Sequence, residues 1–364
     1  MVRDPMLYPQ SLARANAPSL HLLTEAPLNA ELTYQQQVGV ITPNHAFYVR
    51  NHFPVPTLDL ATWQLTIAGA VAQPTVLTLA DWQMLPRRSL VVTMECGGNG
   101  RIGMHPTAQG EPWGYGAVST AEWSGVPLHA ILAATGIAPE AVEILVTGAD
   151  AGVVPEVGQH IAYARSLSVA QALHPDTLLA DTMNGEPLPP NHGFPVRLIV
   201  PGWYGMAAVK WVTRIEALRT PFAGFYQRDR YVLVYPEQGD APPIPLTTMG
   251  VRALITTPAE GATLATGTIP MCGVAWSGAA PIDAVQVSVD DGATWQEATW
   301  TSAASQYAWR TWEFRWQAMH AGPVRLRSRA IDTAGTQQPE AITWNTLGYA
   351  NHSIQAVSVM VGDH

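Results

Sequence analysis

The sequence predicts an α+β domain followed by an all-β sandwich domain of the immunoglobulin type. The chain has 364 residues, more than one ordinary hydrophobic core accommodates, so two domains are expected. Short strand-like and helix-like runs mix in the first part of the chain without a regular βαβ repeat, which favours α+β over a doubly wound sheet. Beyond residue 247 the helical patterns vanish, and alternating strands with frequent turns indicate a β-sandwich.

The elements of the first domain follow from hydrophobic period and from helix start and stop signals. Residues 1–45 are loop-rich and are expected to wrap over the domain. "TLADWQMLP" (78–86) predicts a short helix that Thr78 or Asp81 can cap and Pro86 stops, and "LHAILAATG" (128–136) predicts a helix closed by Gly136. Strands are predicted for "WQLTIAGAV" (63–71), "SLVVTMEC" (89–96), "VEILVTGAD" (142–150), "FPVRLIVPG" (194–202) and the strand-like "AAVKWV" (207–212).

A proline-rich stretch, "PEQGDAPPIPLT" (236–247), predicts the linker, so the domains are expected at 1–235 and 236–364. In the second domain, "DAVQVSVDDGATWQEATW" (283–300) predicts a hairpin with an Asp-Gly turn. Three further runs continue with period two: 307–316, 322–332 and 342–361.

Composition excludes several classes of function. The net charge of −9 argues against nucleic acid as a partner, because phosphate backbones require a basic surface. No apolar stretch approaches the roughly 20 residues that a membrane helix needs. The first twenty residues show no apolar segment typical of a secretion signal, so a cytoplasmic protein is expected, or a periplasmic one if a leader was removed. Two cysteines cannot make a disulfide framework or a four-cysteine metal site.

Cys96 lies at the mouth of a glycine-rich turn, in "VVTMECGGNGR" (91–101). The glycines at 97, 98 and 100 let the chain turn tightly and let a bulky group approach the backbone. A thiolate is a soft ligand that suits a transition metal, and a neighbouring arginine such as Arg101 lowers a thiol pKa. The alternative is a buried structural thiol, which is the interpretation that fits Cys272 in "IPMCGVAW". The residues alone leave both interpretations of Cys96 open.

Two polar clusters accompany this turn. Arg50, Asn51 and His52 are contiguous before two prolines, and they form either a rigid polar wall or a solvated loop. His192, Arg197 and Lys210 lie in or beside apolar runs, and Lys210 is the only lysine of the chain. A buried cation needs a partner, so either a bound anion or a neighbouring carboxylate is expected there.

Five motifs in order resemble the sulfite oxidase family of molybdopterin enzymes: "VRNHFPVP", "ECGGNGR", "WGYGAVSTAEWSGVPL", "MNGEPLPPNHGFPVRLIVPGWYG" and "VKW". The resemblance runs from about residue 45 to the C-terminus. It implies a molybdopterin-binding α+β catalytic domain, an immunoglobulin-like dimerisation domain and a homodimer.

The resemblance also implies roles for single residues. Cys96 is similar to the thiolate ligand of molybdenum, Arg50 and Arg101 to arginines that bind the substrate anion, and Tyr163 to the active-site tyrosine. The implied anion for Arg197 and Lys210 is the phosphate of the cofactor. The positions that match cofactor-binding residues are Tyr48, Val49, Arg50, Asn51, His52, Asp150, His192, Arg197, Ala208, Val209 and Lys210.

The implied reaction is the molybdenum-dependent oxidation of sulfite to sulfate by oxygen-atom transfer. No C-x-x-C-H motif occurs and no haem-binding segment precedes residue 45, so we expect no haem and an external electron acceptor such as a cytochrome or dioxygen. The alternatives are a related reductase acting on nitrate or another oxyanion or S-oxide, and, more remotely, a non-catalytic binding module.

One departure from the family pattern weakens the sulfite assignment. Sulfite oxidases tend to carry a further arginine ahead of a tryptophan-rich stretch, here "SQYAWRTWEFRW". The nearest match is Ser305, and Arg310 lies within the stretch on a face that alternation does not fix. Nitrate reductases of the family also lack this arginine.

Overall fold

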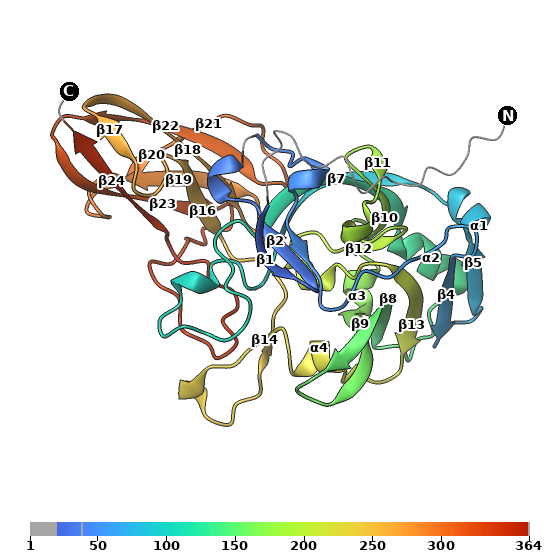
Figure 1. Cartoon of the computed structure of the whole chain (residues 1–364). Helices are drawn as coiled ribbons and strands as arrows, with labels where there is room; N and C mark the ends of the chain where they lie inside the picture. Colours follow the sequence, from blue (N-terminus) through green and yellow to red (C-terminus); the bar gives the residue numbers. More distant parts are fainter. Residues whose placement is uncertain (1–19, 38, 363–364) are drawn as a thin grey trace.

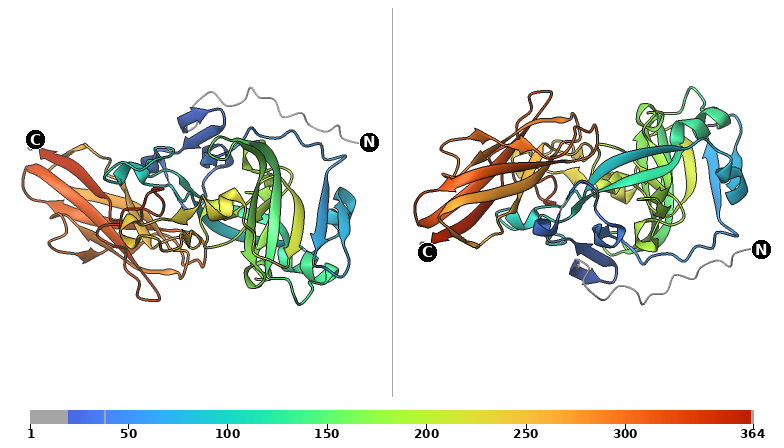
Figure 2. Two further views of the ribbon diagram at one scale, coloured as in Figure 1. Left: turned by 90° about the horizontal axis from the view of Figure 1, so that it is seen from below. Right: turned by 90° about the horizontal axis from the view of Figure 1, so that it is seen from above.

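The structure, a computed structural model of the chain, describes residues 20–37 and 39–362. The molecule is elongated, with the first part of the chain at one end and the C-terminal part at the other (Figures 1 and 2). The prediction that no secretion signal is present concerns residues 1–19, which lie outside the described part of the chain. Among the described helices, none has the length and apolar character needed to cross a membrane.

Residues 20–45, predicted as loop, begin with a hairpin that joins a third short strand. Its strands are β1 (His21–Glu25), β2 (Leu28–Glu31) and β3 (Val49–Arg50), and two 3-10 turns follow β2, η1 (Tyr34–Gln36) and η2 (Asn44–Ala46). The Glu31 carboxylate accepts hydrogen bonds from the backbone N–H groups of Gly114 (2.7 Å) and Gly116 (3.0 Å). Tertiary contacts, which the local pattern does not show, therefore order this segment.

Two five-stranded sheets form the first half of the molecule. The first has the order β11-β10-β7-β6, with β12 also paired to β10. It comprises β6 (Arg88–Glu95), β7 (Val118–Pro127), β10 (Leu178–Met183), β11 (Glu186–Pro187) and β12 (Arg197–Ile199). The second has the order β5-β4-β13-β8-β9. It comprises β4 (Gln64–Gly69), β5 (Thr75–Thr78), β8 (Glu143–Val154), β9 (Gln159–Ser168) and β13 (Val212–Leu218). Only β13 and β4 are parallel neighbours in these two sheets.

The helices of this half are short and lie beside the sheets, so the domain is mostly β rather than an even α+β mixture (Figure 1). They are α1 (Leu79–Gln83), α2 (Leu128–Thr135), α3 (Val169–Ala172) and α4 (Phe225–Arg228). Thr78 caps α1 as predicted, because its hydroxyl accepts from the Asp81 N–H (3.3 Å) while the Asp81 carboxylate accepts from the Thr78 N–H (2.9 Å). Gly136 follows α2 with a φ of 68°, which favours glycine.

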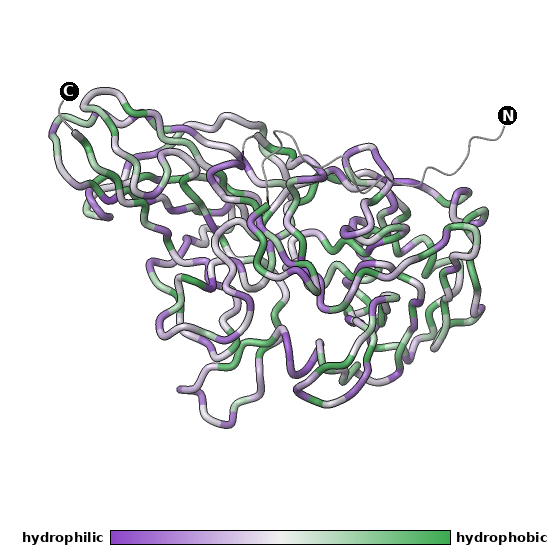
Figure 3. The backbone as a smooth tube through the Cα atoms, in the orientation of Figure 1, coloured by the Kyte–Doolittle hydropathy of each residue, from purple (hydrophilic) through white to green (hydrophobic). Residues whose placement is uncertain are grey.

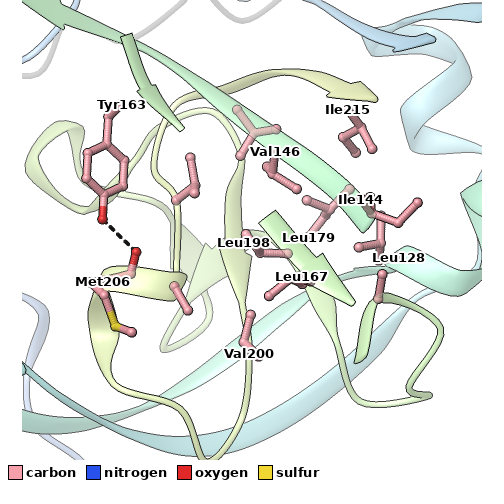
Figure 4. Close-up of a cluster of buried hydrophobic side chains, with 14 of the residues drawn as sticks. Leu128, Ile144, Val146, Tyr163, Leu167, Leu179, Leu198, Val200, Met206 and Ile215 are labelled. Carbon is pink, nitrogen blue, oxygen red and sulfur yellow. Dashed lines mark hydrogen bonds between the residues drawn. The ribbon is translucent and has the colours of Figure 1, made fainter. Parts of the chain in front are cut away.

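The core of this half fills the space between the two sheets (Figure 4). Leu179 and Leu198 of the first sheet and Ile144, Val146 and Ile215 of the second are fully buried. The buried Tyr163 hydroxyl lies beside this aliphatic cluster and donates to the Met206 carbonyl (2.7 Å). Burial on this scale fixes how the two sheets pack, and the ends of their strands then position the site.

The strand predicted at 207–212 is wrong. The segment holds the end of a 3-10 turn, η5 (Gly205–Ala207), and then irregular chain up to the start of β13 at Val212. Trp211 has a φ of 52°, and its indole N–H donates to the Pro190 carbonyl (2.9 Å). The apolar character of the segment reflects burial, which irregular chain shares with strands.

The predicted linker, 236–247, contains one turn, η6 (Pro236–Gln238), and one short strand, β15 (Ile244–Pro245). That strand pairs with β14 (Val232–Leu233), so this stretch folds back as a small projecting hairpin (Figure 1). The boundary between residues 235 and 236 stays a prediction.

The C-terminal half is a sandwich of two sheets. One has the order β16-β18-β22-β21 and comprises β16 (Arg252–Thr257), β18 (Gly267–Trp276), β21 (Thr299–Trp300) and β22 (Arg310–Ala318). The other has the order β17-β24-β23-β19-β20 and comprises β17 (Thr263–Ala265), β19 (Ile282–Ser288), β20 (Gln296–Glu297), β23 (Gly322–Asp332) and β24 (Ala356–Gly362). Their inner faces share one buried core, and hydrophobic and hydrophilic stretches alternate along the strands (Figure 3). The assignment to the immunoglobulin type stays a prediction.

Two predictions in this half need correction. The hairpin expected at 283–300 forms between β19 and β20, but its last residues cross to the other sheet, where β21 pairs with β22. The run 342–361 is a strand only from Ala356 onward. Residues 342–355 are irregular and return to the first half, where the Trp344 indole donates to the Pro106 carbonyl (2.7 Å).

Candidate active site

An inner cavity collects most of the residues that the sequence singled out. It lies among β3, the end of β6, β8, β9 and the turns around η4 (Pro190–His192) and η5. Its lining residues are Tyr48, Arg50, Asn51, His52, Cys96, Gly97, Asp150, Tyr163, Asn191, His192, Arg197, Gly205, Met206, Ala208, Lys210 and Tyr231. Residues from positions 48 to 231 therefore converge on one site.

Cys96 follows the last residue of β6 and faces this cavity. Its side chain is 6% exposed, and burial raises the pKa of the thiol, although Arg50 opposes that shift. The glycine at 98 is required because a Cβ there would lie 2.8 Å from the Arg101 guanidinium. Gly100 has a φ of 82°, so the turn after Cys96 needs glycine there as well. The geometry supports the expectation that the glycines serve close approach and tight turning.

No group of three or more His, Cys, Asp or Glu side chains within residues 20–37 and 39–362 is arranged to hold a metal ion. A metal bound at Cys96 would therefore take its other ligands from a cofactor or from solvent. A single protein thiolate is the donor expected for a metal whose other ligands belong to an organic cofactor.

The inner end of the cavity is cationic. Arg197 is buried, it lies over the Trp123 ring at 5.2 Å, and its Nε has no hydrogen-bond partner among the described residues. The Lys210 ammonium donates to the Asn191 carbonyl (2.9 Å) and to the Asn51 side chain. No carboxylate of the described chain lies within ion-pair distance of either cation. No ion pair formed by the described residues therefore satisfies these cations, which favours the alternative of a bound anion, although Asp150 of the same cavity acts electrostatically on Lys210.

Ionisation at this end reflects burial among like charges. Burial, together with Arg197 and Lys210, lowers the pKa of His192 to about 3, so its imidazole is neutral near pH 7. Burial also lowers the pKa of Arg197 to about 10. Burial raises the pKa of Asp150 to about 7 even though Lys210 acts in the opposite direction. An anionic ligand would relieve the repulsion between the two cations.

Three tyrosine rings contact the His52 ring, and the hydroxyl groups of two of them, Tyr163 and Tyr231, have different partners. The Tyr163 ring stacks on the His52 ring with centroids 4.6 Å apart, but its hydroxyl is bound to the Met206 carbonyl (Figure 4). The Tyr231 hydroxyl lies 2.6 Å from His52 Nε2. Burial raises the pKa of Tyr231, so the phenol stays protonated. Tyr231 lines the inner cavity and also a second, outer cavity that opens beside it. The sequence did not point to Tyr231, because its stretch, "RDRYVLVY", carries no local signal.

Arg101 is placed differently from Arg50. Its guanidinium donates to the carbonyls of Glu111 (2.7 Å), Leu347 (3.1 Å) and Gly348 (3.1 Å), and it lies 5.1 Å from the Tyr349 ring centroid. Arg50 donates through Nη1 to the Asn29 side chain (3.1 Å) and the Asn51 carbonyl (2.5 Å) and lines both cavities. Arg101 lines only the outer cavity. Its main contacts therefore connect the turn after Cys96 to Glu111 and to Leu347 and Gly348.

The outer cavity, of about 310 Å³, shares Arg50, His52, Cys96 and Tyr231 with the inner one. Its walls include the rings of Phe53, Trp113, Phe225, Tyr226 and Tyr349, and its charged residues are Arg50, Arg101, Glu111, Glu156 and Arg230. Neither Ser305 nor Arg310 lines this space. The part of the C-terminal half that reaches the site is the segment 345–351, through Tyr349. The stretch in which a third arginine was sought is therefore not the one that faces this cavity.

Two predicted cofactor contacts, Val49 and Val209, do not line either cavity with their side chains. Both are buried, and the Val209 carbonyl accepts from the Leu198 N–H (2.8 Å), so they support the wall behind the site. Asn191, Gly205 and Met206 line the inner cavity and were not predicted, although Asn191 and Gly205 belong to a motif quoted above and Met206 directly follows it.

Comparison with known proteins gives matches over most of the chain. Residues 52–226 match the family "Oxidoreductase molybdopterin binding domain", and residues 244–361 match "Mo-co oxidoreductase dimerisation domain". Mitochondrial sulfite oxidase of Mus musculus is 33% identical, over 94% of this chain and 66% of the relative, and sulfite oxidase of Gallus gallus is 32% identical, over 91% and 76%. An inducible nitrate reductase of Glycine max is 33% identical, over 93% of this chain and 41% of its own length.

A solved structure, the sulfane dehydrogenase SoxCD from Paracoccus pantotrophus, superposes with a TM-score of 0.84. It is 30% identical, over 94% of this chain and 88% of that chain. The chain thus spans 66% of the length of the mouse relative and nearly all of this solved chain.

Proposed function

The chain belongs to the sulfite oxidase family of molybdopterin-dependent oxidoreductases, and from this premise we propose that it oxidises sulfite to sulfate at a molybdenum centre. The reaction consumes one sulfite and one water and yields one sulfate, two protons and two electrons, which pass to an external acceptor. The observation that carries the proposal is the position of Cys96, which lines both cavities together with Arg50 and Tyr231, while the inner cavity also holds Arg197 and Lys210.

The residues present fit the molybdenum cofactor. Arg197 Nε, Asp150 Oδ1 and Asn51 Nδ2 are buried polar atoms without partners in the described chain, and all three residues line the inner cavity. A pterin with a phosphate offers donors and acceptors for such atoms and an anion for Arg197 and Lys210. Cys96 would be the protein ligand of the metal. When bound, the cofactor supplies the oxygen atom and accepts the two electrons.

The chain's own residues would bind and orient the substrate. Arg50 provides a guanidinium that faces both cavities, so it is our candidate for the contact with the sulfite oxygens. The protonated Tyr231 hydroxyl and His52 provide a hydrogen-bonding pair beside it. Arg101 adds positive charge behind Gly98 while its donors hold the carbonyls of the segment 345–351.

A second candidate function is the oxidation of sulfur carried on a larger group. The outer cavity is walled by aromatic rings and holds more space than an inorganic anion of four or five atoms needs. The solved relative SoxCD is named a sulfane dehydrogenase. Reduction of nitrate remains the other alternative from the sequence analysis, and no feature of the cavity favours it.

The test combines metal analysis with turnover of three substrates on one purified sample. We expect about one molybdenum per chain and sulfite-dependent reduction of ferricyanide. Thiosulfate, which contains a sulfane sulfur, probes the second candidate, and nitrate with a reduced viologen probes the third. A sample that contains molybdenum but turns over only thiosulfate or nitrate would replace the sulfite assignment.

Cys96→Ser is the direct test of the metal ligand. A hydroxyl is a hard and weakly acidic ligand, so turnover should be lost while the fold remains. Cys272→Ser is the matched control, because that thiol lies in β18 outside both cavities and should leave turnover unchanged. Full activity of Cys96→Ser would remove the sulfur from the site.

We also propose that the C-terminal half forms a homodimer, on the basis of its match to a dimerisation domain. The absence of haem, the identity of the acceptor and the cellular compartment stay predictions.

A further inference from the structure

The residue that precedes Cys96 is a carboxylate buried against the C-terminal half. Glu95 Oε1 accepts from Nη1 of Arg252, the first residue of β16, at 2.6 Å, and both side chains are 1% exposed. Glu95 Oε2 accepts from the Trp276 indole N–H at 2.9 Å. The last residue of the first half's strand β6 is thus bound to two strands of the other half.

Arg252 has few other ways to satisfy its charge. Its Nε and Nη2 have no hydrogen-bond partner within the described chain, and its guanidinium lies 5.4 Å from the Tyr115 ring centroid and 5.8 Å from that of Trp276. Both aromatic rings and the carboxylate stabilise the buried cation. Removing one partner of such a pair leaves the other charge buried and uncompensated, which is strongly destabilising.

The rest of the turn after Cys96 is also held by the C-terminal half. The Ala350 N–H donates to the Gly97 carbonyl (2.8 Å), and the Asn351 side chain donates to the Gly100 carbonyl (2.7 Å). Arg252 reaches the Asn99 carbonyl as well, at 3.4 Å. Five residues of the stretch 95–101 therefore have a partner beyond residue 250, namely Glu95, Gly97, Asn99, Gly100 and Arg101.

We propose that Arg252 is a positioning residue of the metal centre: paired with Glu95, it fixes the turn that carries Cys96 and offsets the negative charge behind the thiolate. The C-terminal half is then a working part of the redox site in addition to its proposed role in dimerisation. This inference rests on the proposed function only in that the thiolate binds molybdenum.

The sign of the electrostatic effect follows from the geometry. A carboxylate without a counter-ion beside a metal-bound thiolate disfavours the addition of electrons to the metal, because charges in a dry interior are poorly screened. Arg252→Met should therefore shift the molybdenum midpoint potentials to more negative values. Glu95→Gln leaves Arg252 without its anion and should shift them to more positive values. The double variant removes both charges and should return towards the wild type.

The experiment is a redox titration of the holoenzyme monitored by the electron paramagnetic resonance of molybdenum, with molybdenum content measured on each sample. Arg310→Met is the matched control, since Arg310 lies in the same half, packs on Trp300 and lines neither cavity. Opposite shifts in the two single variants, recovery in the double variant and no shift in the control are the expected result. Equal potentials in all variants, or shifts of the same sign, would overturn the proposal.

A fold defect in Arg252→Met does not remove the test, because Glu95→Gln keeps an acceptor for the Trp276 indole N–H. The midpoint potentials of Glu95→Gln and of the double variant then decide the sign of the electrostatic effect. Failure of the proposed function is recognised separately. A wild type without molybdenum refutes the metal centre, while coupling between Glu95 and Arg252 in a double-mutant cycle of urea unfolding still decides whether the pair fixes the turn. Additive effects in that cycle would refute the positioning role.

Discussion

Tyr231 and Tyr163 both contact the His52 ring, but the Tyr231 hydroxyl lies against His52 Nε2, whereas the Tyr163 hydroxyl is bound to the Met206 carbonyl. We expect Tyr231→Phe to lower kcat/KM for sulfite by about tenfold, the effect of losing one hydrogen bond worth about 1.4 kcal/mol at the substrate. Tyr163→Phe should lower the free energy of unfolding by about 1 kcal/mol and change kcat/KM by less than about threefold. Steady-state kinetics and urea unfolding of both variants check this. A larger kinetic loss in Tyr163→Phe would support the active-site role that the sequence resemblance implies for Tyr163.

The burial of His192 predicts how the free energy of unfolding depends on pH. Its pKa in the folded chain, about 3, lies below the usual value near 6.5, so the unfolded chain binds a proton that the folded chain does not. The contribution to the free energy of unfolding is present above pH 6.5 and is lost as pH falls from 6.5 towards 3.

Between pH 7 and pH 5, the wild-type apoprotein should therefore lose about 2 kcal/mol more stability than His192→Gln. Urea unfolding at the two pH values measures the difference. His320→Gln is the control, because His320 is exposed, and it should behave as the wild type does. Parallel pH profiles for wild type and His192→Gln would show that His192 is not buried in its neutral form.

The sequence alone groups residues of the candidate site where chemistry and local pattern coincide, and the fold brings these groups to one cavity. Arg50, Asn51 and His52 are neighbours in the chain, and Cys96 carries its glycines with it, so a short motif identifies each group. Tyr231 has a φ of 56° and reaches the site only through the fold, so no window of sequence marks it. The function of Arg252 was invisible for the same reason, because its partner Glu95 is 157 residues away.

Among the elements, the segment 345–351 links the two halves and depends on Asn345. This side chain, 1% exposed, donates to the Tyr349 carbonyl (2.8 Å) and accepts from the Tyr349 N–H (3.1 Å). Asn345→Ala removes both bonds and should lower the free energy of unfolding by about 2 kcal/mol.

Because Leu347 and Gly348 in this segment hold Arg101, kcat/KM of Asn345→Ala should fall as well. Thr346→Ala, an exposed change in the same segment, is the control and should change neither quantity. Unfolding and kinetics that match the wild type would show that the segment keeps its shape without Asn345.

The elements also show why some strands were predicted and others were not. β23 (Gly322–Asp332) coincides with its predicted range because more buried and less buried residues alternate over its whole length. The run 342–355 was also predicted as strand, but it is irregular, and Trp344 and Asn351 donate to the carbonyls of Pro106 and Gly100 in the first half of the molecule instead of pairing with a neighbouring strand. Alternation reports which side chains are buried, and it does not report what buries them.

At the scale of the whole molecule, two parts are joined at the turn that carries Cys96. If the C-terminal half also forms the proposed homodimer, the assembly should sediment as two copies of the 39.2 kDa chain. Sedimentation equilibrium across a tenfold range of concentration measures this. A single-chain mass at every concentration would contradict the dimer and would leave the proposed chemistry unaffected.

Lys210, the one lysine of the chain, is placed inside the inner cavity. Reagents that acylate or cross-link lysine side chains therefore find no such target on the rest of the surface. Tryptic peptides will end almost entirely at arginine, and chemical mapping of this protein's neighbours must rely on carboxylates, thiols or guanidinium groups.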